Sequence, residues 1–495
     1  MSTQADCTAE SPNTARSIQI SKKAVIVGAA VVFLLYLIAC ILTLVLEKGS
    51  YLRDETGAII SGTYVEDASL EGLKWWQYFA APVMILNPAA DGSGTVWAIL
   101  FLLIIIGAIF TALDESGILV YMVQWLNHRF GAKKHILLFV LPFTFMFLGS
   151  TAGMFEELIP LVPVVVMLCY ALGWDSLTGL AITVLASCFG FTAGIVNPFT
   201  VGVAQTLGGL QMYSGIGLRI LVFVIAYAVL MGFLYPYVRK IQKQPQKSPV
   251  YAQDLERKAQ MGVIMNDFTP EAKKGKALVW FGCWMLGVVI FALLAIIINR
   301  FVYEGFADYI MYVTLVIYVA AGIGACLICG LRGKTLLKQL GKGTLTLLPA
   351  VAMILIAGGI RYIIEEGDIM DTILYHAVNA LGGASPFGGT LIIYGIIFVF
   401  EMFIPSGSAK AFLLMPMIYD MMDLMLIDRQ VAVLAFTFAD GFANVLLPTN
   451  AGLLLILGMT AVDYGKWFKW SIKIQGTLLA ITIGILALAQ FAVYA

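Results

Sequence analysis

Two stretches of the sequence interrupt apolar runs in a similar way. The first is Gly190-Phe-Thr-Ala-Gly-Ile-Val-Asn197-Pro198, and the second is Gly441-Phe-Ala-Asn-Val-Leu-Leu-Pro448-Thr449-Asn450. They lie inside the long apolar segments 173–210 and 430–460. Pro lacks a backbone donor, and Gly and Asn favour turns, so neither segment can be one uninterrupted helix. We therefore predict two membrane-crossing helices, each broken in the middle.

The composition of the chain places these segments in a membrane. Of the 495 residues, 60% are apolar and only 12% are charged, which is about half the charged fraction of soluble domains. The apolar residues come in blocks of roughly 20, the length that crosses a hydrocarbon core. Uninterrupted spans are expected at 24–46, 95–113, 216–238, 277–299, 309–330, 344–364 and 471–494. The pattern predicts an all-α polytopic membrane protein with about eleven membrane-crossing or re-entrant units.

Two further apolar stretches, 135–171 and 388–422, are divided by short polar turns. The turn in the first is Gly149-Ser-Thr-Ala-Gly153, and the turn in the second is Pro405-Ser-Gly-Ser-Ala409. We interpret both stretches as re-entrant helical hairpins that enter and leave the membrane on one side. Irregular backbone at membrane depth is tolerated only where it is buried in protein or lines a cavity. The turns and the breaks therefore predict a shared polar site.

The charges of the loops indicate one orientation. The segment 239–276 has nine Lys or Arg and four acids, and 331–343 has four bases and no acid. By contrast, 47–76 has six acids and three bases, and 365–387 has four acids and no base. Positive charge is enriched on the cytoplasmic side of membrane proteins. We therefore expect the N-terminus, 239–276 and 331–343 inside, and the C-terminus outside.

With this orientation the two hairpins, and the two broken helices, run in opposite directions through the membrane. The chain is thus predicted to contain two inverted repeats, a feature typical of secondary transporters. The expected divisions are a cytoplasmic tail at 1–23, a first repeat at 24–238, a cytoplasmic linker at 239–276, a linking helix at 277–299 and a second repeat at 309–495. An ion channel is the remote alternative, because a channel does not need such a repeat. No nucleophile–base set or metal cluster in the sequence indicates an enzyme.

Polar side chains at the turns and breaks are the candidate ligands of the transported solute. The hydroxyl and amide groups belong to Ser150, Thr151, Asn197, Thr200, Ser406, Ser408, Asn444, Thr449 and Asn450. Oxygen ligands of this kind also suit an alkali cation, and Ser150, Asn197, Ser406 and Thr449 are the candidate sodium ligands. Proton coupling is the alternative, and no other cofactor is expected. The competing interpretation is that small polar residues serve close helix packing.

Charged residues in apolar segments are the second group of candidates, because each is costly unless it is paired or hydrated. They are Glu156, Glu157, Glu401, Lys410 and Asp440. We expect Lys410 to bind a carboxylate of the solute and Glu156 or Glu157 to bind an amino group. A structural pair between Lys410 and a glutamate is the alternative. This charge set predicts an amino acid substrate, and a basic one in particular; a small mono- or dicarboxylate coupled to sodium or protons is the second hypothesis.

The chain resembles the anaerobic four-carbon-dicarboxylate carrier-like family, and within it the YfcC branch, which includes proteins called arginine/ornithine antiporters. The resemblance is densest at Gly153-Met-Phe-Glu-Glu157, Asn197-Pro-Phe199, Ser406-Gly-Ser408 and Phe438-Ala-Asp-Gly-Phe442. It implies a homodimer whose transport domains move like elevators against a fixed scaffold, with 135–210 and 388–460 as the moving parts. The expected partners are a small-molecule solute, membrane lipid and a second copy of the chain in the bacterial inner membrane. Zero net charge argues against nucleic acid as a partner.

Overall fold

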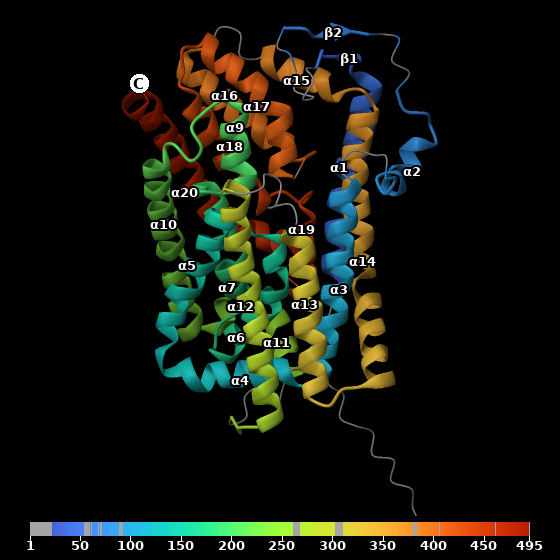
Figure 1. Ribbon diagram of the computed structural model, residues 1–495, viewed down its shortest axis with the longest axis vertical. Helices are drawn as coiled ribbons and strands as arrows, with labels where there is room; N and C mark the ends of the chain where they lie inside the picture. The colour runs from blue at the N-terminus through green and yellow to red at the C-terminus, as the bar shows by residue number, and fades with distance from the viewer. Residues whose placement is uncertain are drawn as a thin grey trace, which may run out of the picture.

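The computed structural model describes residues 22–53, 60, 62–67, 69, 72–88, 93–260, 268–301, 310–379, 384–404, 406–460 and 462–494. This part of the chain is mostly α-helical, and most helices run along the long axis of the molecule (Figure 1). One short antiparallel sheet joins β1 (Gly49–Ser50) to β2 (Val65–Glu66) at one end. The prediction of a helical protein is thus confirmed, apart from this small sheet.

One group of helices, here called the long-helix body, forms one side of the molecule. Its members are α1 (Lys22–Val45), α2 (Gln77–Met84), α3 (Ser93–Glu115), α12 (Ala272–Phe301), α13 (Ile310–Ile328) and α14 (Gly333–Glu366). α14 packs on α1, α2 and α3, and α13 packs on α3 and α12. The crossing of α3 and α14 depends on glycine, since a Cβ at Gly343 would lie 2.2 Å from the carbonyl oxygen of Gly107.

A second group, here called the hairpin body, contains the interrupted segments. It comprises α5 (Lys134–Ala152), η2 (Glu156–Leu161), α6 (Val162–Ala171), α7 (Ser176–Leu180), η3 (Ala181–Leu185), α8 (Ala186–Ala193), η4 (Pro198–Gly202), α9 (Val203–Leu207), α16 (Pro386–Phe400), α17 (Gly407–Leu424), α18 (Arg429–Asn444) and α19 (Ala451–Thr460). α8 and α18 form its core: they pack on each other, and every residue of both is buried except Arg429, the first residue of α18. Two long helices flank it, α10 (Ile216–Lys243) and α20 (Tyr464–Leu488), the latter continued by η7 (Ala489–Val493).

The interruptions lie where Gly, Pro and Asn occur in the sequence. α8 ends before Gly194, which adopts a left-handed φ of 48°, and Asn197 then caps η4. α18 ends at Asn444, and α19 begins only at Ala451. In the first hairpin, α5 ends before Gly153, whose φ is 62°. The backbone therefore changes direction at residues that have little cost in left-handed or turn conformations.

The remaining short elements gather at the two ends of the molecule. α4 (Ile118–Phe130), η1 (Gly131–Lys133), η5 (Pro245–Lys247) and α11 (Tyr251–Gln260) lie at the end where α14 begins (Figure 1). The strands, α15 (Met370–Asn379) and the C-terminus lie at the opposite end. The basic segments and the acidic segments thus occupy different ends, as the loop charges predict. Which end is cytoplasmic stays a prediction.

Several described helices are long and apolar enough to cross a membrane, judged by length and composition alone. Four such stretches are Ile118–Ala152, Ser176–Leu207, Ile216–Lys243 and Tyr464–Val493. Shorter apolar helices accompany them at Val32–Val45, Val162–Ala171, Leu315–Ile328 and Pro386–Phe400. The apolar surface is therefore spread over both bodies, as expected of a polytopic protein.

Candidate functional site

The first hairpin turn packs against both helix breaks. The backbone N–H of Val196, in the first break, donates to the carbonyl of Ser150 over 3.2 Å. A Cβ at Gly153 would lie 2.6 Å from Oδ1 of Asn197, so only glycine fits there. On the other side, the Phe155 ring approaches the second break, where a Cβ at Gly452 would lie 2.7 Å from it. The first turn therefore holds the two breaks close together.

The second hairpin turn packs against the first break and α18. A Cβ at Gly407 would lie 3.0 Å from Cγ2 of Thr200 and 3.3 Å from Oδ1 of Asp440. Ser406 caps the start of α17, where its hydroxyl accepts from the N–H of Ala409 over 3.5 Å and lies 3.5 Å from the hydroxyl of Ser408. All four polar motifs thus lie together inside the hairpin body.

A buried charge cluster lies beside these turns. The Lys410 ammonium donates to Oδ1 of Asp440 over 2.8 Å and forms an ion pair with Oε2 of Glu401. Their side chains are only 0%, 1% and 2% exposed, respectively. Such charges are tolerated only when they compensate one another. When all three are ionised, the cluster carries one more negative than positive charge.

A chain of amides connects this cluster across the second break. Nδ2 of Asn444 donates to the carbonyl of Asp440 over 2.9 Å, and Nδ2 of Asn450 donates to Oδ1 of Asn444 over 2.6 Å. Oδ1 of Asn450 accepts from the N–H of Leu453 over 2.9 Å, which caps the start of α19. The ends of the second broken helix are therefore held by side chains that lead to the charges.

Among the described residues, polar atoms without partners occur at both breaks. Within the described chain, Nδ2 of Asn197, Oγ1 of Thr200 and Oγ1 of Thr449, which lies in the second break, have no hydrogen-bond partner. These side chains belong to residues that are 0%, 1% and 4% exposed. Buried polar atoms usually have partners. All three can donate, so they suit an acceptor such as a carboxylate oxygen.

The other predicted hydroxyls bond within their own helix. The Ser150 and Thr151 hydroxyls both donate to the carbonyl of Phe147, over 3.0 Å and 2.7 Å. Their oxygens keep lone pairs, so the prediction that Ser150 binds sodium is neither supported nor excluded by these bonds. The side chains of Glu156 and Glu157 lie outside the described part of the structure, and their predicted role stays a prediction.

Arg219 is a buried cation that the sequence analysis did not single out. It is 0% exposed on α10, and it donates from Nε to the carbonyl of Ile195 over 3.2 Å and from Nη2 to that of Tyr213 over 3.1 Å. Arg219 therefore holds the backbone of the first break by a hydrogen bond from α10. The available signal was a single Arg within the apolar span 216–238.

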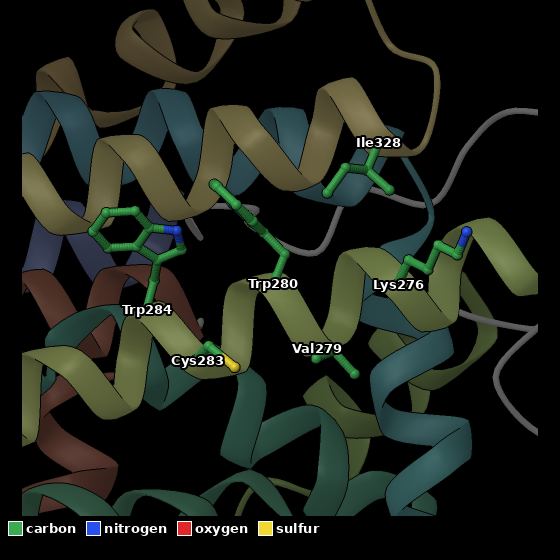
Figure 2. Close-up of a pocket in the computed structure, with 6 residues that line it drawn as sticks. All are labelled: Lys276, Val279, Trp280, Cys283, Trp284 and Ile328. Carbon is green, nitrogen blue, oxygen red and sulfur yellow. The ribbon is translucent and has the colours of Figure 1, made fainter.

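The surface groove in Figure 2 is separate from these polar groups. It has a volume of about 450 Å³ and lies between α12 and α13 of the long-helix body. Its lining residues are Lys276, Val279, Trp280, Cys283, Trp284 and Ile328. None of them belongs to a hairpin or a broken helix, so the groove is not part of the candidate site.

Comparison with known proteins identifies relatives over most of the chain. Residues 28–491 match the family model described as the C4-dicarboxylate anaerobic carrier, DcuC. An Escherichia coli (strain K12) protein named "Putative basic amino acid antiporter YfcC" is 29% identical over 412 residues, which cover 81% of this chain and 79% of that protein. A Haemophilus influenzae protein described as uncharacterized is 25% identical over 410 residues, with coverage of 81% and 77%.

Two solved transporter structures also align with the whole chain. The Alcanivorax borkumensis YdaH transporter has a TM-score of 0.46 and 15% identity, and covers 93% of this chain and 98% of its own. Neisseria gonorrhoeae MtrF, from a class of antimetabolite efflux pumps, has a TM-score of 0.44 and 17% identity, with coverage of 95% and 96%.

The family match spans nearly the whole chain and confirms the resemblance that the sequence motifs indicated. It agrees with the apolar helices found in both bodies. The chain belongs to the C4-dicarboxylate anaerobic carrier family, and it is a multi-pass membrane transporter.

Proposed function

We propose that the protein is a secondary active transporter for an amino acid, and specifically for a basic one. The observation that carries this proposal is the buried cluster in which one ammonium group, on Lys410, faces two carboxylates, on Glu401 and Asp440. Its excess negative charge attracts an ammonium or guanidinium group of a solute. The name of the Escherichia coli relative points to the same substrate class and to antiport.

The unpartnered donors near the breaks supply the other half of the proposed site. An amino acid has a carboxylate close to its amino group. The amide N–H of Asn197 and the hydroxyls of Thr200 and Thr449 can donate to that carboxylate. Lys410 is held by two carboxylates, so it binds the solute carboxylate only after it releases one of them. We therefore expect Lys410 to exchange one of these two carboxylates for the carboxylate of the solute.

A dicarboxylate is the second candidate, because the family description names C4-dicarboxylates. A doubly negative solute would meet repulsion from Glu401 and Asp440 while both are ionised. Its binding would require a proton on one of these carboxyl groups, or a bound cation. Dicarboxylate transport would therefore be coupled to protons or to sodium.

For the transport cycle we propose an elevator-like movement of the hairpin body, together with α10 and α20, against the long-helix body. This division is supported by the packing, since each group packs mainly within itself and fewer contacts, such as those of α19 with α14 and α1, join the two groups. The inverted repeats are part of the same proposal: α16 and α17 lie toward the end with β1, whereas α5 begins near α4 at the other end (Figure 1). We further propose a homodimer formed through the long-helix body, in the inner membrane, with α11 on the cytoplasmic side.

Uptake by proteoliposomes tests the substrate class directly. We expect saturable uptake of arginine, ornithine or lysine, accelerated by preloading with the same solute, since counterflow is a property of carriers and not of channels. Neutral amino acids, succinate and lactate should compete poorly. Uptake of succinate that basic amino acids do not inhibit would contradict the amino-acid proposal and favour a dicarboxylate. Imposed sodium and proton gradients then identify the coupling ion.

A further inference from the structure

The helix α11 lies across one end of the hairpin body (Figure 1). Its buried side carries charged residues. Asp254 is 4% exposed and Arg257 is 9% exposed, whereas Leu255 is 54% exposed. A surface helix normally buries its apolar side. α11 is therefore held mainly by hydrogen bonds and charge interactions. The strength of such interactions depends on the pH of the solution.

We call α5 to α9 the first half of the hairpin body, and α16 to α19 with the start of α20 the second half. Two side chains of α11 bind the first half. Oδ1 of Asp254 accepts from the hydroxyls of Tyr170 and Ser176, over 2.8 Å and 2.7 Å, and its Oδ2 accepts from the N–H of Ser176 over 2.9 Å. Nζ of Lys258 donates to the carbonyl of Trp174 over 3.1 Å. These contacts lie where the first hairpin leads into the first broken helix.

Two other side chains of the same helix bind the second half. Nη2 of Arg257 donates to the carbonyl of Met459, near the end of α19, over 3.1 Å. Nε2 of Gln253 donates to Oδ2 of Asp463 over 3.1 Å, and Nζ of Lys466 donates to Oε1 of Gln253 over 3.0 Å. One short helix thus bridges parts of the chain that are far apart in sequence.

A second buried carboxylate makes the contacts of Asp254 sensitive to pH. Asp175, which is 5% exposed, lies beside Asp254 and accepts from the hydroxyls of Tyr237 and Ser248 over 2.5 Å and 2.7 Å. Burial and then the charge of Asp175 raise the pKa of Asp254 to about 6, against the hydrogen bonds from Ser176 and Tyr170. The other titratable or charged groups around Asp254 are Cys169 and Tyr170 of α6, Tyr237 of α10, and Arg257 and Lys258 of α11.

We propose that α11 is a proton-sensitive clamp, which joins the two halves of the hairpin body and holds them more tightly as the solution at this end becomes acidic. The docked carboxyl group of Asp254 binds a proton more tightly than a free one, whose pKa is 3.8. Docking therefore gains strength as the pH falls through about 6, and loses it as the pH rises. For one group with these two values, docking strengthens about tenfold between pH 7.5 and pH 5. The clamp does not depend on which solute is carried.

Hydrogen exchange of the full-length protein in lipid nanodiscs tests the proton dependence. Amide protection across 251–260, corrected for intrinsic exchange rates, should be about tenfold higher at pH 5 than at pH 7.5. The variant Asp254→Asn should lose this difference. The variant Glu256→Gln, which alters an exposed carboxylate on the same helix, should keep it. Protection that does not change with pH in the natural protein, or a difference that persists in Asp254→Asn, would overturn the proposal.

Two further variants test the bridging between the halves. Gln253→Ala removes contacts with the second half, at Asp463 and Lys466, and Lys258→Gln removes a contact with the first. If α11 is one clamp, either variant should raise exchange at both 174–180 and 452–460, with exchange in α14 unchanged. If each variant loosened only the half that it contacts, α11 would be a linker with independent contacts and the clamp would be wrong.

Discussion

The two helix breaks occupy equivalent places in the sequence, but their chemistry differs. At the second break, Asn444 and Asn450 form a chain of hydrogen bonds that ends on Asp440 and Lys410. At the first break, Asn197 caps η4 with its oxygen and leaves its N–H₂ group without a partner. The second break is linked to charges, although Thr449 there also has a hydroxyl without a partner in the described chain, and the first break presents neutral donors. The proposed amino-acid site uses this difference, because the two ends of such a solute differ in charge.

The largest effect is expected from removing Lys410, the cation of α17 that pairs with Asp440 beside the second break. Lys410→Gln leaves Glu401 and Asp440 buried without a compensating charge, and breaking a buried pair in this way costs about 3–5 kcal/mol. The melting temperature in detergent should fall sharply, and uptake should be lost. The double variant Lys410→Gln with Asp440→Asn should recover part of the stability, because it removes one of the two unpaired charges. A single variant as stable as the natural protein would mean that the cluster is not ionised as described.

A smaller effect is expected where the first hairpin turn meets the first break. Gly153→Ala places a Cβ against Oδ1 of Asn197, on a residue with φ of 62°. Gly173→Ala is the matched control, because Gly173 has φ of 80° and no atom within 4 Å of its Cβ position. The control should cost about 1–2 kcal/mol from backbone strain alone. Gly153→Ala should cost more and also impair uptake. Equal stability and equal uptake in the two variants would show that this contact does not position the break.

The smallest effect on stability, but a clear one on binding, is expected from the unpartnered hydroxyls. Thr449→Val removes a buried hydroxyl that has no partner among the described residues, so the melting temperature should hardly change. The solute affinity should fall by about 1–2 kcal/mol, or roughly 5- to 30-fold. Thr437→Val is the control, since its buried hydroxyl donates to the carbonyl of Leu434 over 3.0 Å. The control should lose stability and keep its affinity. The opposite pattern would remove Thr449 from the proposed site.

The sequence predicted the positions of the two helix breaks well, because these depend on the local conformational preferences of Gly, Pro and Asn. The first hairpin turn lies later than predicted, since α5 continues through Ser150 and Thr151 to Ala152 and the chain turns at Gly153. The sequence also indicated Lys410 and Asp440, because a charge inside an apolar segment is conspicuous. The partners of Lys410 could not be predicted in the same way. The sequence analysis assigned Lys410 to a carboxylate of the solute and kept a structural pair with a glutamate as the alternative, whereas the contacts seen in the described structure come from Glu401 and Asp440. Which carboxylate reaches a lysine depends on how the second hairpin packs on α18, and no local pattern encodes that packing.

The contact between Arg219 and the first break also could not be predicted from a local sequence pattern. Arg219 lies on α10 and binds the carbonyl of Ile195, which lies 24 positions earlier in the chain. A single Arg in an apolar span indicates that it has some partner, but it does not indicate which one. The docking of α11 is a similar case, because its charged face resembles an exposed surface until the facing loops are placed.

The close packing of the two buried helices α8 and α18 has a consequence for how the protein is made. Gly441 of α18 packs so closely on Thr192 of α8 that a Cβ there would lie 2.3 Å from the Thr192 nitrogen. α18 begins roughly 240 residues after α8 ends, so at about 5–20 residues per second the ribosome needs roughly 10–50 seconds to produce it. During that interval α8 can pack on α5, which precedes it, but the face that later contacts α18 has no partner from that helix. The early half of the protein therefore requires lipid, the translocation machinery or a chaperone to cover this face of α8 until the later half arrives.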